Sequence, residues 1–315
     1  MKVGVIGAGA FGTSLAIALA SKCSVTIWAR DIGHLTRARA SKHLPDVLLP
    51  ASINVTGDLA DIDADVCLLA IPTQQLTSFL TDHAPKIRAS RVVLCSKGID
   101  LKTGLGPAEV LRSHLPDTTA AVLSGPSFAV DIAQGKPTAL TLATASAQAG
   151  QDLQHILSTE MLRIYRSTDV TGVQIGGALK NVVAIGCGAA MGAGLGESAR
   201  SALITRGFAE MVRFATASGA QVETLSGLSG LGDLVLTATS DKSRNYRFGM
   251  ALGAGEAFGD HVTVEGAATA QVLRQIAKAR GIEMPVCEAI ASLVAGDVSV
   301  ATALRSLLAR PLREE

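Results

Sequence analysis

The sequence contains few aromatic residues, and its charges nearly cancel. Phenylalanine, tryptophan and tyrosine make up 3% of the 315 residues, although hydrophobic residues as a whole reach 48%. Alanine, valine, leucine and isoleucine must therefore fill the core. The formal net charge is only +1 and no basic run is present, so the sequence predicts no nucleic-acid partner.

Metal-ligand motifs, paired cysteines and long apolar runs are also scarce. The five cysteines are scattered without CxxC spacing, which is typical of reduced, buried thiols in a cytoplasmic protein. The six histidines show no HExxH or similar spacing, so we predict no metal site. The longest weakly charged apolar stretch, residues 182–196, is shorter than the ~20 residues that a membrane span needs, and no membrane insertion is predicted.

A glycine-rich turn lies at the start of the chain. Residues 2–6 predict a buried strand and residues 13–20 an apolar helix, and the letters between them are GAGAFG. This pattern is the dinucleotide-binding fingerprint, whose helix N-terminus faces the phosphates. Gly7 would permit the tight turn, Gly9 would let the backbone approach a pyrophosphate, and Gly12 would let the helix lie close to the sheet. The alternative is a structural turn without a cofactor.

The residue after the second predicted strand, residues 24–29, bears on the choice of cofactor. In a Rossmann unit this position meets the adenosine ribose, where an acidic side chain accepts from the 2′-hydroxyl and an arginine suits a 2′-phosphate. Arg30 is followed here by Asp31. Arg30 favours NADP, whereas Asp31 leaves NAD open. The alternative is a solvated charge pair at a strand end.

Further apolar runs predict an α/β fold with a mostly parallel sheet that is covered on both faces. The predicted strands lie at residues 65–71, 91–95, 120–123, 138–143 and 162–165. Ligands bind beyond the carboxyl ends of strands in such sheets. Polar or turn-forming residues follow three of these strands, and we expect them to line one cleft: Pro72, Lys97, Gly125 and Ser127.

The pattern becomes helical from about residue 169 onwards. We therefore predict a Rossmann-type NAD(P)-binding domain over residues 1–167 and an all-helical substrate-binding domain over residues 168–315. The predicted helices lie at residues 174–195, 199–218, 264–281, 285–295 and 299–308. Glycines at positions 186, 188 and 192 would let neighbouring helices come very close, either inside one subunit or between the two subunits of a homodimer.

One lysine stands within the first of these helices. Residues 175–185 are apolar around most of the helix circumference, so the helix should be buried. Burial disfavours the ammonium form, and the pKa of Lys180 should therefore fall toward the working pH. Such an amine can accept and return a proton. Alternatively, Lys180 snorkels to the surface or pairs with a carboxylate.

Two polar segments follow this helix in the sequence. Residues 227–233 form a glycine-rich loop that ends in Asp233, which could orient Lys180, hold a substrate hydroxyl or cap the next helix. Residues 243–245 combine a hydroxyl, a guanidinium and a carboxamide, a set that suits a phosphate. The alternative for this second segment is an ordinary polar loop, and Lys97 is the other candidate cation.

Taken together, these motifs resemble the bacterial-type NAD(P)-dependent glycerol-3-phosphate dehydrogenases nearly from end to end. The similar segments are residues 7–13, 96–98, 124–129, 176–181, 202–207, 230–234, 243–245 and 264–266. Ala10 stands where the family commonly has serine, and residues 253–262 form a shorter segment than is usual there.

The resemblance implies interconversion of sn-glycerol 3-phosphate and dihydroxyacetone phosphate by hydride transfer with NAD(P)H, which supplies glycerophospholipid synthesis. It implies Lys180 as the proton acceptor, with Lys97 adding positive charge near the reacting oxygen. The implied substrate contacts are Lys97, Gly125, Ser127, Lys180, Asp233, Ser243, Arg244 and Asn245. The implied cofactor contacts are Gly7, Gly9, Ala10, Phe11, Gly12, Arg30, Lys97, Ala129, Arg244, Thr263 and Glu265.

Two other hypotheses remain from the sequence. The chain could be another two-domain NAD(P)-dependent dehydrogenase that acts on a hydroxyacid or keto acid, although the phosphate-binding character of residues 243–245 argues against it. It could also be a non-catalytic NAD(P)-binding sensor. A sensor, however, has no need of a buried Lys180 together with a phosphate-binding cluster.

Overall fold

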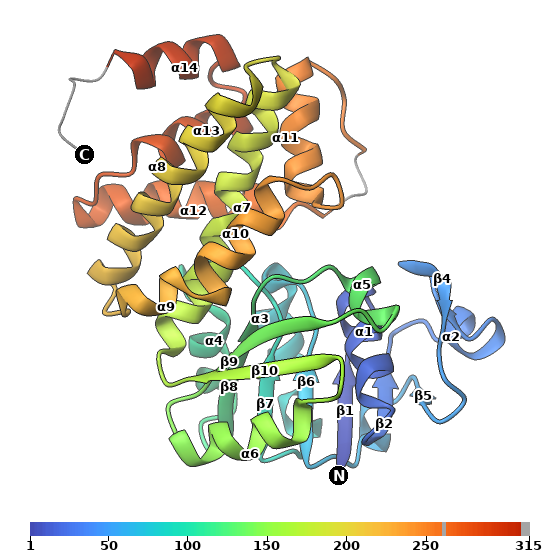
Figure 1. Ribbon diagram of the computed structural model, residues 1–315. Coiled ribbons are helices and arrows are strands. Elements are labelled where there is room, and N and C mark those ends of the chain that lie inside the picture. The colour runs from blue at the N-terminus through green and yellow to red at the C-terminus, as the bar shows by residue number, and fades with distance from the viewer. Residues whose placement is uncertain (260–262, 310–315) are drawn as a thin grey trace. The chain divides into compact units, whose positions relative to one another are not determined.

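The computed structural model describes residues 1–259 and 263–309. These residues divide into two compact units, one formed by residues 1–97 and 105–174 and the other by residues 98–104 and 175 onwards. The first unit contains a mostly parallel sheet with helices, and the second is helical (Figure 1). The predicted fold class is therefore confirmed.

The sheet of the first unit has eight strands in the order β10-β9-β8-β7-β6-β1-β2-β5. Their bounds are β1 Lys2–Ile6, β2 Ser24–Trp28, β5 Asn54–Thr56, β6 Val66–Leu69, β7 Arg91–Leu94, β8 Thr119–Ser124, β9 Thr138–Ala143 and β10 Leu162–Ser167. The six strands β8, β7, β6, β1, β2 and β5, which are neighbours in this order, are all parallel. Strand β9 pairs antiparallel with β8 and parallel with β10. The order reverses between β1 and β6, which is the point where doubly wound sheets bind dinucleotides.

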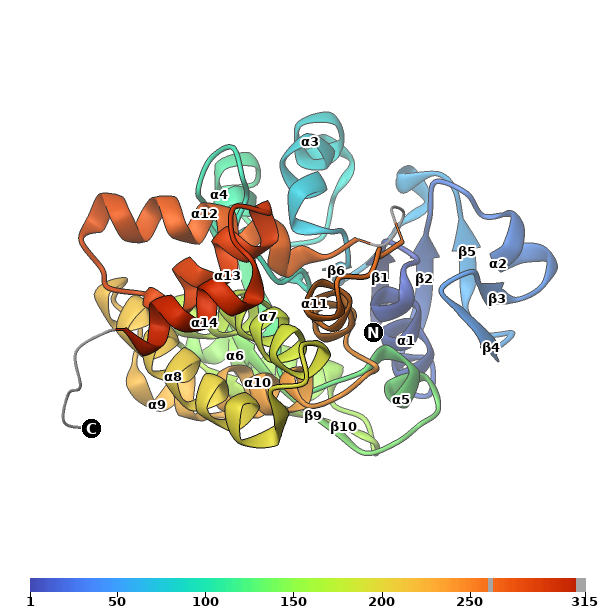
Figure 2. The same ribbon diagram turned by 90° about the horizontal axis from the view of Figure 1, so that it is seen from above.

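Apolar side chains on successive positions of the central strands enter different cores, because neighbouring residues of a strand point to opposite faces. Val5 of β1 and Leu68 of β6 belong to the cluster that contains Leu15 of helix α1 (Ala10–Leu19), whereas Ile6 belongs to the cluster with Leu76 of helix α3 (Thr73–His83). The helices thus cover both faces of the sheet (Figure 2), and the strands appear as continuous apolar runs in the sequence.

The remaining elements of the first unit are helices, two short strands and 3-10 turns, and most of them were not predicted from the sequence. They are α1 Ala10–Leu19, α2 Gly33–Arg37, β3 Ala40–Ser41, β4 Leu44–Leu48, α3 Thr73–His83, α4 Pro107–His114, α5 Ala129–Ala133, α6 Ala147–Leu157 and 3-10 turns at Leu59–Asp61 and Ala84–Lys86. The prediction that the first helix starts at residue 13 was wrong. Gly9 is its N-cap, and the Thr13 N–H donates to the Gly9 carbonyl oxygen at 2.9 Å, so the glycine-rich turn supplies the first helical turn.

The helical unit is built around α7, Val170–Gly192, whose first residues belong to the sheet-containing unit. The other elements are α8 Gly196–Ala217, α9 Val222–Ser226, a π-helical turn Leu228–Gly232, α10 Asp233–Ala238, α11 Arg244–Ala254, α12 Glu265–Arg280, α13 Pro285–Ala295 and α14 Val300–Leu308. The elements between residues 222 and 254 were not predicted as helices, because α9, the π-helical turn and α10 are short and α11 begins with polar residues.

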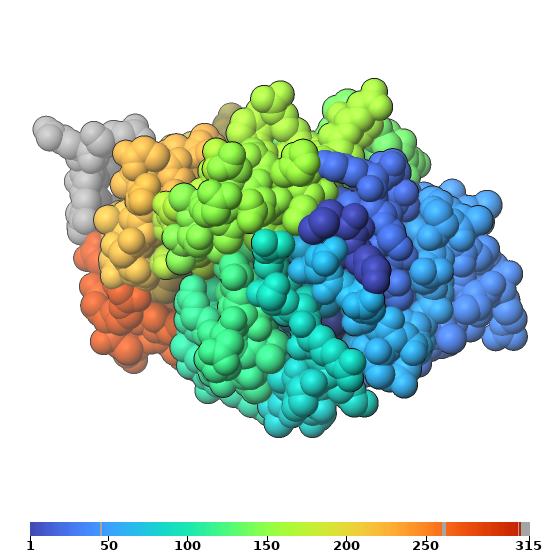
Figure 3. Space-filling model, turned by 90° about the horizontal axis from the view of Figure 1, so that it is seen from below, coloured from blue at the N-terminus to red at the C-terminus, as the bar shows by residue number. Residues whose placement is uncertain are grey.

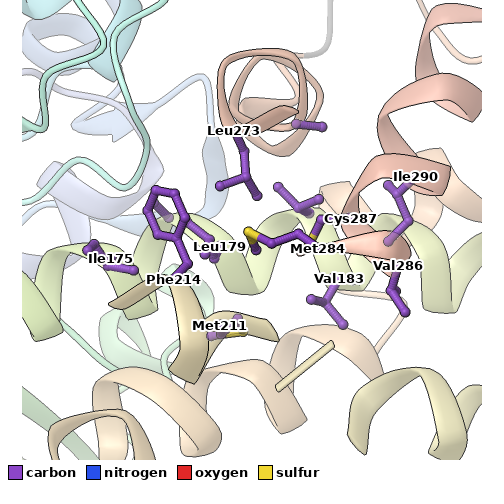
Figure 4. Packing of buried hydrophobic residues seen from close by; sticks show 14 of the residues in the cluster. Ile175, Leu179, Val183, Met211, Phe214, Leu273, Met284, Val286, Cys287 and Ile290 are labelled. Atoms are coloured by element: carbon purple, nitrogen blue, oxygen red, sulfur yellow. The ribbon is translucent and has the colours of Figure 1, made fainter. Parts of the chain in front are cut away.

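Helix α7 forms the middle of the apolar core of its unit. Ile175, Leu179 and Val183 lie among buried side chains of α8, α12 and α13, including Met211 and Leu273 (Figure 4). Of the helices in the described residues, α7 alone is long and apolar enough to cross a membrane by length and composition, but 89% of its most apolar 18-residue window is buried inside the protein. Burial by neighbouring helices accounts for its apolar composition.

Glycines bring the backbones of α7 and α11 into direct contact. A Cβ atom on Gly188 would lie 2.0 Å from the Tyr246 carbonyl oxygen, and one on Gly249 would lie 2.0 Å from the Ile185 carbonyl oxygen. Gly192 and Gly253 repeat this arrangement one turn further along. The close helix approach predicted from the α7 glycines therefore occurs within one chain.

A methyl group at Gly188 should force α7 and α11 apart. Overpacking typically costs ~1–3 kcal/mol, and the backbone atoms in contact here cannot rotate away. We expect Gly188→Ala to lower the free energy of unfolding in urea by about this amount. Gly57→Ala is the control, since a Cβ there meets its nearest atom at 3.8 Å. Equal stability of Gly188→Ala and the wild type would contradict the close contact.

Glu210 of α8 links α8 to the start of α13. Its side chain is buried, and its carboxylate oxygens accept the N–H groups of Val286 at 2.7 Å and Cys287 at 2.9 Å. Burial raises the pKa of Glu210 above its ordinary value, although the two N–H donors act in the opposite direction. The neutral form is thus favoured more in the folded protein than in the unfolded chain.

This raised pKa predicts a pH dependence of stability. A group with a raised folded pKa stabilises the protein fully below its unfolded pKa and less as pH rises through the folded pKa. We therefore expect the wild type to lose stability relative to Glu210→Gln, which does not titrate, as pH rises from about 4 to about 8. Urea unfolding of both proteins across this range measures the difference, and a constant difference would disprove the raised pKa.

All five cysteines are free. Cys23 is half-buried and the other four are buried, as expected for structural thiols. Burial raises the pKa of Cys67, Cys95 and Cys187 to about 12, so these thiols stay protonated and unreactive near neutral pH.

Candidate functional site

The glycine-rich turn has the geometry that a bound dinucleotide requires. Gly7 adopts φ +111°, and a Cβ there would lie 2.5 Å from the Ala70 carbonyl oxygen. A Cβ on Gly12 would lie 2.0 Å from the Gly7 carbonyl oxygen, so only glycine lets α1 start this close to β1. A Cβ on Gly9 would meet nothing within 4 Å. The backbone at Gly9 is therefore open to an approaching ligand.

The N-terminus of α1 offers donors beside this open position. No side chain caps the helix at Gly9, and Ala10 and Phe11 form its half-buried first turn. The first N–H groups of a helix have no acceptor within the helix, and they attract anions together with the helix dipole. The residues present thus fit the pyrophosphate of NAD(P).

Three of the four residues predicted at the carboxyl edge of the sheet, Lys97, Gly125 and Ser127, come together within the first unit. Lys97 follows β7, and its Nζ donates to the Gly125 carbonyl oxygen at 3.2 Å. The Ser127 hydroxyl donates to the same oxygen at 3.3 Å. Gly125 has φ +143° and approaches the backbone of Leu140, which explains why glycine stands there. Ala129 is the first residue of α5.

The structure shows an ion pair after β2, as in the alternative from the sequence, but its basic partner is not Arg30. Arg30 is exposed. Asp31 forms its ion pair with Lys42, at 2.9 Å, and also accepts the Gly33 N–H at 3.0 Å. The hydrogen bond from Lys42 is the main cause that lowers the pKa of Asp31. Lys42 lies in the turn between β3 and β4 and was not recognised from the sequence.

Lys180 is buried in the second unit, and its amine donates to a carboxylate and to a hydroxyl oxygen. Its side chain is 8% exposed, and Nζ donates to Asp233 Oδ1 at 2.9 Å and to Thr237 Oγ1 at 2.6 Å. Of the alternatives for Lys180, the structure therefore shows pairing with a carboxylate and no snorkelling. The ion pair favours the ammonium form, which opposes the effect of burial on the lysine.

Asp233 is held inside the protein and is not the N-cap of the helix that follows it. It is fully buried as the first residue of α10, whose N-cap is Gly232. The glycine-rich segment before it is a π-helical turn rather than the predicted loop. A Cβ on Gly230 would lie 1.9 Å from the Leu225 carbonyl oxygen, so glycine is needed for this tight turn. Asp233 is thereby placed to orient Lys180.

Residues 243–245 start a helix, so the alternative of an ordinary polar loop was wrong. The Ser243 hydroxyl caps α11 by accepting the Tyr246 N–H at 3.2 Å, and Arg244 is exposed in the first turn. Asn245 Nδ2 donates to Asn181 Oδ1 at 2.9 Å, and Asn245 Oδ1 accepts the Gly266 N–H at 3.0 Å. One N–H of the Asn245 carboxamide therefore stays outside these two bonds.

The two predicted cofactor contacts near the start of α12 lie in the second unit. Glu265 is the first residue of α12 and is partly buried, and Thr263 is exposed in the segment before it. Residues 260–262, which end the segment that is shorter than is usual in the family, lie outside the described residues.

A hollow of about 910 Å³ lies at the opposite, amino edge of the sheet. It is lined by residues such as Met1, Lys22, Arg91, Asp152 and His155, and by none of the predicted site residues. Figure 3 views this side of the first unit, with the dark blue N-terminal residues at the surface.

The described residues contain no group of three or more histidine, cysteine or acidic side chains that could hold a metal.

Comparisons with known proteins assign the family. The models of the NAD-dependent glycerol-3-phosphate dehydrogenase N-terminus and C-terminus match residues 2–150 and 169–305. A Paracoccus denitrificans protein named glycerol-3-phosphate dehydrogenase (NAD(P)+) is 54% identical over 315 residues, the full length of both chains. The structure of glycerol-3-phosphate dehydrogenase from Coxiella burnetii has a TM-score of 0.92 and 34% identity, over 98% of this chain and 99% of that one. This chain belongs to the NAD-dependent glycerol-3-phosphate dehydrogenase family.

Membership of this family decides between the three hypotheses from the sequence. The chain is an NAD(P)-dependent oxidoreductase that acts on glycerol 3-phosphate. The complex of D-mandelate dehydrogenase with NADH also matches, with a TM-score of 0.63 at 15% identity over 94% of this chain and 98% of that one. At this identity, that likeness shows the fold alone.

Two residues of this dehydrogenase that contact predicted site residues were not predicted from the sequence: Thr237, which contacts Lys180, and Asn181, which contacts Asn245. Thr237 lies one helical turn after Asp233, so the spacing would have placed it on the same face if a helix had been predicted from residue 233. Asn181 directly follows Lys180 and is 3% exposed. A buried polar residue beside a buried lysine needs a partner, but only the tertiary structure identifies that partner as Asn245.

Loss of the Thr237 hydroxyl should impair the dehydrogenase through Lys180. Thr237→Val keeps the shape and removes an acceptor of the buried ammonium, and hydrogen bonds to charged groups are worth ~1.5–3 kcal/mol. We expect kcat to fall about tenfold or more, while the KM for NADPH stays unchanged. Thr239→Val is the control, because that hydroxyl lies at the end of α10 and donates to the Val235 carbonyl oxygen instead of contacting Lys180. Wild-type kcat in Thr237→Val would show that the hydroxyl does not support Lys180.

Proposed function

We propose that this chain reduces dihydroxyacetone phosphate to sn-glycerol 3-phosphate and also catalyses the reverse oxidation, with Lys180 as the acid–base residue. The observation that carries this role is the buried contact of the Lys180 ammonium with Asp233 and Thr237. A lysine held in this way has one defined position and a partner that stabilises its charged form. It is thus prepared to donate a proton.

The sheet-containing domain, residues 1–167, would bind the cofactor, and the helical domain, residues 168–315, would bind the substrate. NAD(P)H supplies the hydride when it is bound. The proposed cofactor contacts are Gly7, Gly9, Ala10, Phe11, Gly12, Arg30, Lys97, Ala129, Arg244, Thr263 and Glu265. The exposed position of Arg30 after β2 supports a preference for NADP.

In the reducing direction, the Lys180 ammonium polarises the ketone oxygen and donates the proton as the carbonyl carbon accepts hydride. Lys180 then regains a proton from solvent, and in the oxidising direction its neutral amine takes the hydroxyl proton. Asp233 stabilises the ammonium and fixes Nζ by accepting its hydrogen bond. Lys97 contributes positive charge near the developing alkoxide, which lowers the energy of the transition state.

Ser243, Arg244 and Asn245 would bind the substrate phosphate at the start of α11. The exposed Arg244 fork supplies two donors in one plane, and the helix N-terminus adds its positive dipole end. The remaining Asn245 N–H supplies a further donor. The other proposed substrate contacts are Lys97, Gly125, Ser127, Lys180 and Asp233.

We place the enzyme in the cytoplasm, where its product supplies glycerophospholipid synthesis. The free, mostly buried cysteines support a reducing compartment. A homodimer of this chain must use a surface other than the glycine face of α7, because α11 already covers that face.

Removal of the Lys180 amine should abolish most catalysis while cofactor binding survives. Lys180→Met keeps the chain length, and loss of a general acid–base group typically lowers the rate ~10²–10⁴-fold. Steady-state reduction of dihydroxyacetone phosphate measures the rate, and titration with NADPH checks binding. A turnover within a few-fold of wild type would make Lys180 a structural residue.

Arg244 should matter for the phosphorylated substrate far more than for dihydroxyacetone, the same ketone without phosphate. Phosphate-binding energy also orients the reacting carbon, so Arg244→Ala should lose most kcat/KM on dihydroxyacetone phosphate and little of the low activity on dihydroxyacetone. Arg244→Lys should also be impaired, because lysine lacks the fork.

Equal losses on both substrates would assign Arg244 to the cofactor or to the fold. The variant Asn245→Ala would not distinguish a loss of phosphate binding from a loss of structure. The Asn245 side chain also joins α7 to the start of α12 through Asn181 and Gly266.

A further inference from the structure

The segment after β2 carries one acidic side chain among basic ones. Asp31 lies where a dinucleotide-binding unit reads the adenosine ribose, and an acidic side chain there binds a 2′-hydroxyl but repels a 2′-phosphate. Arg30 precedes it, and Arg37 lies close by in α2, where its Nε donates to the Gly33 carbonyl oxygen at 3.2 Å. Asp31 thus favours NAD, whereas Arg30 favours NADP.

Both oxygens of the Asp31 carboxylate accept hydrogen bonds. Oδ1 accepts the Gly33 N–H at 3.0 Å, and Oδ2 accepts from Lys42 Nζ at 2.9 Å. Lys42 comes from the turn between β3 and β4, so a separate hairpin brings this cation to the strand end. Both side chains are more than half exposed, and such a pair contributes little to stability. Its effect is on the local charge.

We propose that the Asp31–Lys42 ion pair sets the preference of the enzyme between NADP and NAD. While Lys42 holds Asp31, the carboxylate is neutralised and turned toward α2, and Arg30 is left as the charge that a 2′-phosphate meets. Without Lys42, Asp31 repels the phosphate and accepts the 2′-hydroxyl of NAD. Lys42 is a positioning residue in this arrangement, because it acts through Asp31. The inference rests on the proposed function only in that the first unit binds NAD(P).

The test uses nucleotides that lack nicotinamide, so that binding is measured apart from catalysis. Calorimetric titration of the full chain with 2′,5′-ADP and with 5′-ADP isolates the effect of the 2′-phosphate. We expect Lys42→Met to weaken 2′,5′-ADP on the order of tenfold and to leave 5′-ADP unchanged or tighter. All titrations are done at one ionic strength, because salt screens exposed charges.

A double-mutant cycle identifies the partner of Lys42. Asp31→Asn should leave the affinity for 2′,5′-ADP within about twofold of wild type, and adding Lys42→Met to Asp31→Asn should again change it by less than about twofold. Arg30→Ala should weaken 2′,5′-ADP in every background. Lys2→Met is the matched control, since Lys2 forms a similarly exposed ion pair with Asp63 at the amino end of β1.

Two results would overturn the proposal. In the first, Lys42→Met leaves the affinity for 2′,5′-ADP unchanged. In the second, it weakens 2′,5′-ADP equally with and without the Asp31 carboxylate, in which case Lys42 contacts the phosphate itself. The ratio of kcat/KM for NADPH to that for NADH should fall in Lys42→Met as the binding ratio does. A wild-type protein that discriminates the two nucleotides but does not reduce dihydroxyacetone phosphate would refute the proposed function and leave this inference standing.

Discussion

The buried contact between Lys180 and Asp233 is the interaction on which the candidate catalytic site depends. Each charge is costly to remove from water, and the pair is tolerable only because each side chain meets the other at hydrogen-bond distance with Thr237 as a second oxygen. Removal of one partner would leave an uncompensated buried charge. This cost fixes α7 and α10 at one separation and fixes the lysine amine at one point.

The backbone around this pair is shaped to bring it together. The π-helical turn before α10 lies against α7, where a Cβ on Gly176 would be 2.6 Å from the Ser229 carbonyl oxygen. Single π-turns are rare and are frequently found at functional sites. On another side of α7, the glycine contact with α11 brings Asn245 within reach of Asn181. Close contacts at glycines thus place the side chains of Asp233, Thr237 and Asn245 against the polar residues of the apolar helix α7.

The first unit follows a different principle, in which the edge of a sheet gathers the proposed ligand-binding groups. Parallel strands end on the same side, so the glycine-rich turn after β1, Lys97 after β7 and Gly125 after β8 share one edge. Cofactor choice then depends on a short hairpin, β3 and β4, that lies outside the main sheet. Specificity can therefore change through Lys42 without a change in the sheet that binds the dinucleotide.

The sequence by itself determined the α/β class, the strands of the main sheet except β5, the dinucleotide turn and the family, because these depend on local periodicity and on glycines with fixed roles. It also identified Lys180 as exceptional, since one cation in an apolar helix needs a partner. Only the tertiary structure decided the partners. Thr237, Asn181 and Lys42 are separated from the residues they contact by folds of the chain or by helices that short, glycine-rich segments do not reveal. Contacts of this kind depend on close backbone approach and on a hairpin, and neither leaves a periodic pattern in the sequence.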